Sequence, residues 1–210
     1  MKVRSLLTLL SVASFATLAQ AHFVWLERTA DGPAAFFGEW SDNVRENQDG
    51  YLKIITAPRA FAPDGSALAV TPKHDRLVVA TAPAGDLRLT AHYRPEKGET
   101  FVRYYARHGR TDTSAAKLEL EIVPVAKGGN TFSIALKGKP LADTEVTLFS
   151  SVGWSRKFKT GADGRVTLET PWAGQYVIEV AHIEKTAGEH DGRAHQQVRH
   201  VSTLLFDHKA

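Results

Sequence analysis

The chain contains no cysteine, and its only methionine is Met1. The absence of cysteine excludes disulfides, thiolate metal sites, a cysteine nucleophile and lipid anchoring of an exported protein through an N-terminal cysteine. If Met1 is lost with a leader, the remaining chain also lacks a thioether, the soft ligand that selects Cu(I). Any bound metal must therefore be held by imidazole, carboxylate, backbone or the α-amine.

The sequence also lacks the motifs of several large protein classes. No phosphate-binding loop, no G-x-G-x-x-G after a strand and no G-x-S-x-G elbow is present, and the Asp-Gly pairs are turns without the ligand ladder of a calcium loop. After residue 21, no segment approaches the roughly 18 consecutive apolar residues of a membrane-spanning helix. We therefore predict a protein that is not an enzyme of these classes and is not embedded in a membrane.

The first 21 residues have the features of a signal peptide. A short basic start is followed by an apolar run over 6–18 and by Ala19-Gln20-Ala21, the small-x-small pattern that signal peptidase cleaves. Cleavage would leave 189 residues beginning at His22, and removing Lys2 and Arg4 from the 26 basic residues leaves 24 against 23 acidic ones. The mature net charge of +1 does not indicate a nucleic-acid partner. We predict a soluble exported protein, which in a bacterium with two membranes is periplasmic.

Short segments with period-two alternation, separated by turn signals, predict an all-β fold. Residues 87–93 and 118–122 show the alternation most clearly, because each segment has one apolar and one polar face. Further strands are predicted at 23–27, 52–56, 77–81, 101–106, 131–136, 145–149, 165–169, 175–182 and 198–206. A Gly-rich interruption at 125–130 predicts an N-terminal β domain over 22–124 and a C-terminal β-sandwich over 130–210, the latter with Greek-key connections.

His22 is the strongest candidate metal ligand because cleavage would make it the first residue. It would then offer an α-amine and an imidazole that can chelate one ion together, and a divalent metal can displace the protons of both groups near neutral pH. The alternative is that the cleavage site merely falls before one of the nine histidines.

The C-terminal region holds five of those nine histidines. If the strands on either side of the 183–194 loop form a hairpin, His182 lies close to His195 or, with a longer register shift, nearer His200. The alternative is a polar loop with one histidine satisfied by hydrogen bonds at a strand end. Glu27, Glu39, Glu46 and Glu184 could also ligate a metal, but the pattern favours a solvated surface position for each.

The ensemble of short motifs resembles the exported DUF4198 family over almost the whole mature chain. These motifs are AHFVWLE at 21–27, FGEW at 37–40, RE at 45–46, YYA at 104–106, VGW at 152–154, KTGADG at 159–164, PWAGQY at 171–176 and RHVSTL at 199–204. The resemblance implies a periplasmic component of nickel or cobalt uptake, with His22 and then His182 and His200 as its metal ligands. The C-terminal part also resembles the small sandwich of the carboxypeptidase-regulatory or Cna-B type.

Together these observations predict a non-enzymatic protein that binds Ni(II) or Co(II) through His22, His182, His195 and His200. Imidazole and amine nitrogens also suit copper and zinc, so the donor set does not choose the ion. The partner would be an uptake system in the inner membrane. Two alternatives stay open: a structural or partner-binding β-sandwich module without metal, and a copper redox protein built on His22.

Overall fold

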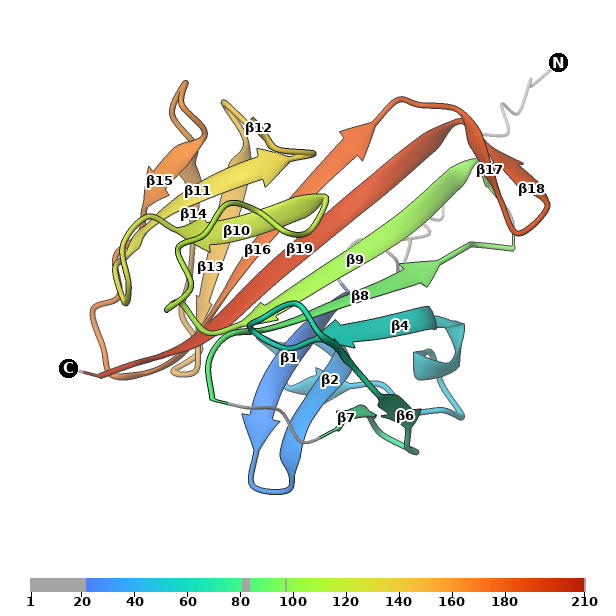
Figure 1. Cartoon of the computed structure of the whole chain (residues 1–210), viewed down its shortest axis with the longest axis horizontal. Coiled ribbons are helices and arrows are strands. Elements are labelled where there is room, and N and C mark those ends of the chain that lie inside the picture. The colour runs from blue at the N-terminus through green and yellow to red at the C-terminus, as the bar shows by residue number, and fades with distance from the viewer. Residues whose placement is uncertain (1–21, 81–83, 97, 210) are drawn as a thin grey trace, which may run out of the picture.

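The computed structural model describes residues 22–80, 84–96 and 98–209, and the predicted signal peptide lies outside them. The prediction of an all-β protein is confirmed, and three sheets make up most of the structure (Figure 1). The central sheet has eight strands in the order β14-β13-β16-β19-β9-β8-β4-β5. Their bounds are β4 Thr56–Phe61, β5 Ala67–Leu68, β8 Leu87–Tyr93, β9 Thr100–His108, β13 Glu145–Ser150, β14 Ser155–Lys159, β16 Gly174–Glu184 and β19 Gln197–His208.

Two smaller sheets pack on opposite faces of the central sheet. The first contains β1 (Phe23–Thr29), β2 (Gly32–Glu39), β3 (Val44–Arg45), β6 (Val70–Pro72) and β7 (Leu77–Val79). The second contains β10 (Leu120–Pro124), β11 (Thr131–Leu136), β12 (Lys139–Pro140) and β15 (Arg165–Thr167). A separate hairpin is formed by β17 (Gly188–His190) and β18 (Arg193–His195).

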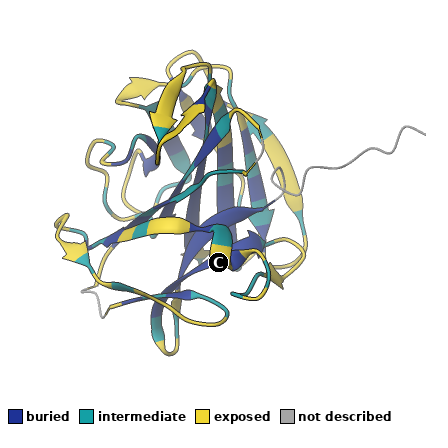
Figure 2. Cartoon of the chain, turned by 90° about the vertical axis from the view of Figure 1, so that its right-hand side faces the viewer, coloured by how far each residue is buried: buried dark blue, intermediate teal, exposed yellow. Residues whose placement is uncertain are grey.

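The central sheet can serve two cores because successive side chains of a strand point to opposite faces. In β9, Tyr104 lies in the core under β1 and β2, whereas Tyr105 lies in the core under β10 and β11. The same division holds in β19, where Val201 joins the first core and Leu204 the second. Buried positions accordingly run along the central strands, and the exposed ones lie at the periphery (Figure 2).

The two segments predicted as separate domains share the central sheet. β19 pairs in parallel with β9, from Gln197 opposite Thr100 to Leu205 opposite His108. β10 precedes the predicted boundary, yet it pairs with β11, which follows it. The two parts of the chain are therefore joined along a strand pair and not only by a linker.

The strand predicted at 52–56 is wrong. Leu52–Ile54 form a 3-10 turn, and β4 begins only at Thr56. The side-chain oxygen of Asn47 accepts from the amides of Asp49 and Gly50, and the amide of Leu52 donates to the Asn47 carbonyl. These local hydrogen bonds satisfy main-chain groups that a sheet ladder would otherwise pair, so the segment forms a turn and not a strand. Leu52 is the only buried residue of the turn, so little burial favours a strand here.

Candidate metal centre

His22 and two glutamates meet at the start of the first sheet. β1 pairs with β2 so that Phe23 lies opposite Gly38, which places His22 beside Glu39 at the end of β2. β2 then pairs with β3, with Gly38 opposite Arg45, so that Glu46 follows directly and its amide donates to the Phe37 carbonyl. Two consecutive hairpins thus bring the three side chains together.

Gly38 makes this arrangement possible. Its φ of 148° lies in the region that favours glycine, and a Cβ at this position would collide with the carbonyl oxygen of Val44. β3 can therefore approach β2 closely only if residue 38 has no side chain. Because β3 leads into Glu46, the glycine fixes where that carboxylate stands.

The His22 imidazole lies between the two carboxylates. Its Nε2 is 2.8 Å from Glu46 Oε1, and its Nδ1 is 3.2 Å from Glu39 Oε1. The His22 side chain is 7% exposed, and those of Glu46 and Glu39 are 17% and 27% exposed. The Phe37 and Tyr51 rings flank the imidazole with centroids at 5.4 and 6.2 Å, and Glu39 is the most exposed of the three polar side chains.

The two nitrogens of His22 differ in their hydrogen bonding. Nε2 is hydrogen-bonded to Glu46, whose other oxygen accepts from the Tyr51 amide. Nδ1 has no hydrogen-bond partner in spite of its short distance to Glu39. If Nε2 is protonated and donates its hydrogen bond to Glu46, the lone pair of Nδ1 points toward the Glu39 carboxylate, which also carries lone pairs. A cation between them would resolve that repulsion.

The separation of these two atoms fits two ligands of one ion. Nitrogen and oxygen ligands at about 2.0–2.2 Å from an ion, at angles between square and tetrahedral, lie about 3.0–3.4 Å apart. The observed 3.2 Å between Nδ1 and Glu39 Oε1 falls within this interval. Glu46 then has the position of an outer carboxylate that orients a ligating imidazole through its other ring nitrogen.

His200 is buried on the other side of the central sheet, where both its nitrogens are engaged. Nδ1 is 2.9 Å from the Tyr105 hydroxyl and Nε2 is 3.2 Å from Glu184 Oε2. Burial lowers the pKa of His200, and the nearby Glu184 and Glu119 carboxylates oppose this effect. A residue held in this way has no free lone pair for an ion.

The structure does not bring His182, His195 and His200 to His22. His182 lies directly opposite His200 in the pairing of β16 with β19, as the longer of the two predicted register shifts requires. His195 packs beside Phe101, with ring centroids 5.5 Å apart, and its Nδ1 is buried without a partner. All three are on the Tyr105 side of the sheet, whereas His22 packs on Phe37, which contacts Tyr104 on the opposite side. The expected convergence of four histidines is therefore corrected: the sheet separates His22 from the other three.

The sequence-based interpretation also placed Glu39 and Glu46 on the solvated surface, whereas both contact His22. The signal that could have identified them is the pair of turns around Gly38, which folds residues 22, 39 and 46 onto one another. Within the described ranges, no three His, Asp or Glu side chains are grouped so that they could hold an ion by themselves. His22 and Glu39 alone provide two candidate ligands.

The structure is an all-β protein in which His22, Glu39 and Glu46 form one polar cluster. In the part of the chain that the structure describes, no helix is long and apolar enough to span a membrane. Residues 96–184 match a family model described as a domain of unknown function (DUF4198), which confirms the expected resemblance over this segment. No curated protein and no solved structure matches the chain. The matched segment runs from β9 to β16 and includes His182, but not His22, Glu39 or Glu46.

Proposed function

We propose that the mature protein binds one divalent transition-metal ion, Ni(II) or Co(II), at its N-terminus. The ligands are the α-amine and Nδ1 of His22 together with the Glu39 carboxylate. The observation that carries the proposal is the unpartnered Nδ1, buried 3.2 Å from Glu39 Oε1 while Nε2 is bonded to Glu46. The ion would be cargo for an uptake system in the inner membrane, which is the role that the family resemblance implies.

The donor set supports a borderline ion over a hard one. Two nitrogens and one carboxylate oxygen suit nickel, cobalt, copper and zinc, whereas calcium and magnesium prefer oxygen ligands only. Glu46 contributes by accepting a hydrogen bond from Nε2–H, which fixes the tautomer in which Nδ1 keeps its lone pair for the ion. The Tyr51 amide in turn holds Glu46 in place.

A competing explanation involves no metal. A doubly protonated His22 between Glu39 and Glu46 would be an ordinary ion-pair clamp. The two explanations differ in what the α-amine does, because the clamp uses only the ring. A change at the α-amine that leaves the imidazole intact therefore distinguishes the metal chelate from the ion-pair clamp.

The test is calorimetric titration of NiCl2 and CoCl2 into the mature protein and into a variant with one alanine before His22. We expect one ion per chain and at least a tenfold weaker affinity in the extended protein, because an amide nitrogen replaces the amine ligand. Glu39→Gln should weaken binding by removing an anionic ligand, and Glu46→Gln by about 10–100-fold through loss of orientation. The exposed Glu99→Gln serves as the matched control.

Metal-free melting temperatures of all variants keep the comparison interpretable. Equal affinities of the mature and extended proteins would rule out the amine chelate. If no ion binds and Glu39→Gln and Glu46→Gln lower the melting temperature alike, the clamp explanation is correct.

A further inference from the structure

A cavity of about 390 Å³ lies between the first of the two smaller sheets and one end of the central sheet. Its walls come from three parts of the chain: β1, the turn from β2 into β3, and the loops at the end of β13 and the start of β16. Its polar and charged lining residues include Glu27, Ser41, Asn43, Arg45, Ser151 and Gln175. The fold thus gathers hydroxyl and amide side chains from distant segments around one space.

The charged groups of this cavity neutralise each other. Glu27 and Arg45 are the charged side chains among the described lining residues, and they form an ion pair at 3.2 Å. Glu27 also accepts from Trp25 Nε1 at 2.8 Å, and the Arg45 guanidinium lies 3.9 Å from the centroid of the Phe36 ring. A charged ligand would find no unpaired counter-ion here, so the lining favours a neutral one.

The uncharged polar side chains of the cavity are accessible. Ser41, Asn43 and Ser151 are exposed, and Gln175 is half-buried. Within the described part of the chain, the Ser41 hydroxyl and the side-chain amides of Asn43 and Gln175 bond to no other protein group. The Ser151 hydroxyl accepts from the main-chain amide of Gln175 at 3.2 Å and can still donate its proton. These groups can exchange solvent for a ligand whose own groups both donate and accept.

Trp40 adds a partly buried aromatic ring to this polar lining. It packs against the core that contains Trp25 and Phe36, and it also borders the cavity. The turn after it is closed by the main-chain amide of Asn43, which donates to the Trp40 carbonyl at 3.2 Å. Asn43 has a φ of 54°, a left-handed conformation that asparagine adopts more readily than most residues. The turn therefore presents an indole and a side-chain amide to the same cavity.

We propose that this cavity binds a neutral sugar unit. A pyranose ring has an apolar C–H face, which would stack on the Trp40 ring, and hydroxyls at its rim, which would exchange hydrogen bonds with Asn43 and Gln175. A carboxylate or an amine on the sugar would gain nothing, because Glu27 and Arg45 already neutralise each other. The volume lies within the range of small-molecule sites, about 300–1,000 Å³.

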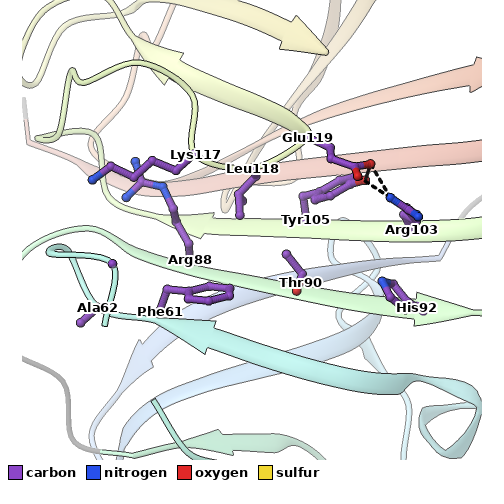
Figure 3. A pocket seen from close by; sticks show the side chains of 11 residues that line it. Phe61, Ala62, Arg88, Thr90, His92, Arg103, Tyr105, Lys117, Leu118 and Glu119 are labelled. Atoms are coloured by element: carbon purple, nitrogen blue, oxygen red, sulfur yellow. Dashed lines mark hydrogen bonds and ion pairs between the residues drawn. The ribbon is translucent and has the colours of Figure 1, made fainter. Parts of the chain in front are cut away.

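The cavity over β8 and β9, drawn in Figure 3, has a different lining. Arg103 is paired with Glu119, as the dashed lines show, and Arg88 and Lys117 both pair with Asp112. Its cations are therefore satisfied by the protein itself. No asparagine or glutamine is among its described lining residues, so it lacks the amide groups that the cavity beside Trp40 offers to a sugar.

The proposed sugar site does not depend on the proposed metal site. Consecutive residues of a strand face opposite sides of a sheet. His22 packs on Phe37 and Trp25 packs on Phe36, so the two sites lie on opposite faces of the hairpin formed by β1 and β2. Metal binding can therefore fail while sugar binding is retained, and the reverse.

The test is titration of glucose, galactose and N-acetylglucosamine into the 15N-labelled mature protein. Two-dimensional NMR spectra follow the indole N–H signals of the four tryptophans and the side-chain amide signals. We expect saturable shifts of the Trp40 and Asn43 signals, with millimolar affinity for at least one of the sugars. Cyclohexanol has a ring without the set of hydroxyls, and glycerol has hydroxyls without a ring, so both should bind roughly tenfold more weakly or worse. Glucuronate should bind no more tightly than glucose.

Variants of the lining residues locate the site. Gln175→Ala and Asn43→Gly each remove one side-chain amide, and glycine tolerates the positive φ of residue 43. Each should weaken sugar binding about fivefold, as expected for the loss of one hydrogen bond. Ser41→Phe, at an exposed position, should abolish binding by filling the cavity. Gln196→Ala, exposed and not among the lining residues, is the matched control and should bind like the unmodified protein.

Melting temperatures establish that each variant is folded. Three outcomes would overturn the proposal: no saturable shift with any of the sugars, folded Ser41→Phe protein that still binds the sugar, or equal weakening by Gln196→Ala and Gln175→Ala. Cyclohexanol or glycerol binding as tightly as the best sugar would overturn the assignment of a sugar unit. Tighter binding of glucuronate than of glucose would overturn the assignment of a neutral ligand.

Discussion

Glu179 is a half-buried carboxylic acid in the central sheet, and its surroundings disfavour the charged form. It lies in β16 between Thr147 of β13 and Thr203 of β19. Burial raises its pKa from 4.5 to about 7, and the positive charge of Arg199 only partly opposes this. Between pH 4.5 and 7 the native protein therefore holds a proton that the unfolded chain has released, so the stability that Glu179 contributes falls as the pH rises through this window.

Glu179→Gln removes this titration and should stabilise the protein at pH 8, where the native carboxyl must ionise against its surroundings. We expect a gain of about 1–3 kcal/mol in the free energy of unfolding at pH 8. At pH 5 the protonated acid and the amide are similar, so little change is expected. Urea unfolding at both pH values measures the effect, with Glu99→Gln as the control. The same difference at both values would contradict a raised pKa.

At the residue scale, the sequence predicted a role for His22 but not which side chains contact it. The position of Glu39 could have been predicted from the Asp31-Gly32 turn, because the hairpin around that turn places residue 39 beside residue 22. The partners of His200 could not be predicted in this way. Tyr105 is 95 positions away in the sequence, and only the pairing of β19 with β9 brings the two together.

At the scale of elements, β8, β9 and the segment into β10 are joined by buried ion pairs. Arg107 donates to Asp86 at 2.6 Å and to Glu121 at 3.0 Å, and these side chains are each 1% exposed. Glu121 also accepts from Arg88 and from the amides of Lys117 and Leu118. Buried ion pairs therefore link β8, β9 and β10 through charged side chains that are not accessible to solvent.

Arg107→Met should be strongly destabilising, because it leaves Asp86 and Glu121 buried with fewer partners. We expect a loss of about 3–5 kcal/mol in the free energy of unfolding. The matched control is Arg156→Met, whose partner Glu169 is 67% exposed, and a change of no more than about 1 kcal/mol is expected there. Urea unfolding of both variants makes the comparison. Similar losses in the two proteins would contradict a structural role for the buried network.

Alternation predicted some strands closely and others not at all. The predicted bounds of 87–93 and 131–136 are those of β8 and β11. β2, with the sequence GPAAFFGE, was not predicted, because six of its consecutive positions are buried and period two is lost. Alternation also could not show that Arg107, a charged position of β9, is buried, since its guanidinium lies in an interior lined by its ion-pair partners Asp86 and Glu121.

At the scale of the molecule, the pairing of β9 with β19 joins the N-terminal and C-terminal parts of the chain in one sheet. The Gly-rich segment at 125–130 predicts two domains, whereas the longest strands of the two parts lie side by side in one sheet (Figure 1). A parallel pair between residues near 100 and residues near 200 leaves no local signal in the sequence, because its register is set by packing on both faces. Val201 and Leu205 of β19 are buried in the core that β1, β2, β8 and β9 provide.

A fragment of residues 130–210 should therefore not fold by itself. Without β9, the main-chain groups on that edge of β19 lose their partners from Gln197 to Leu205, and Val201 and Leu205 lose the core that covers them. We expect poorly dispersed NMR amide signals and no cooperative urea transition from the fragment, whereas the mature protein should unfold in one transition. Adding the complementary fragment 22–129 should recover native signals, because it supplies β9, β1 and β10. A dispersed spectrum and a cooperative transition from 130–210 alone would show instead that the C-terminal sandwich is autonomous and that β9 only docks on it.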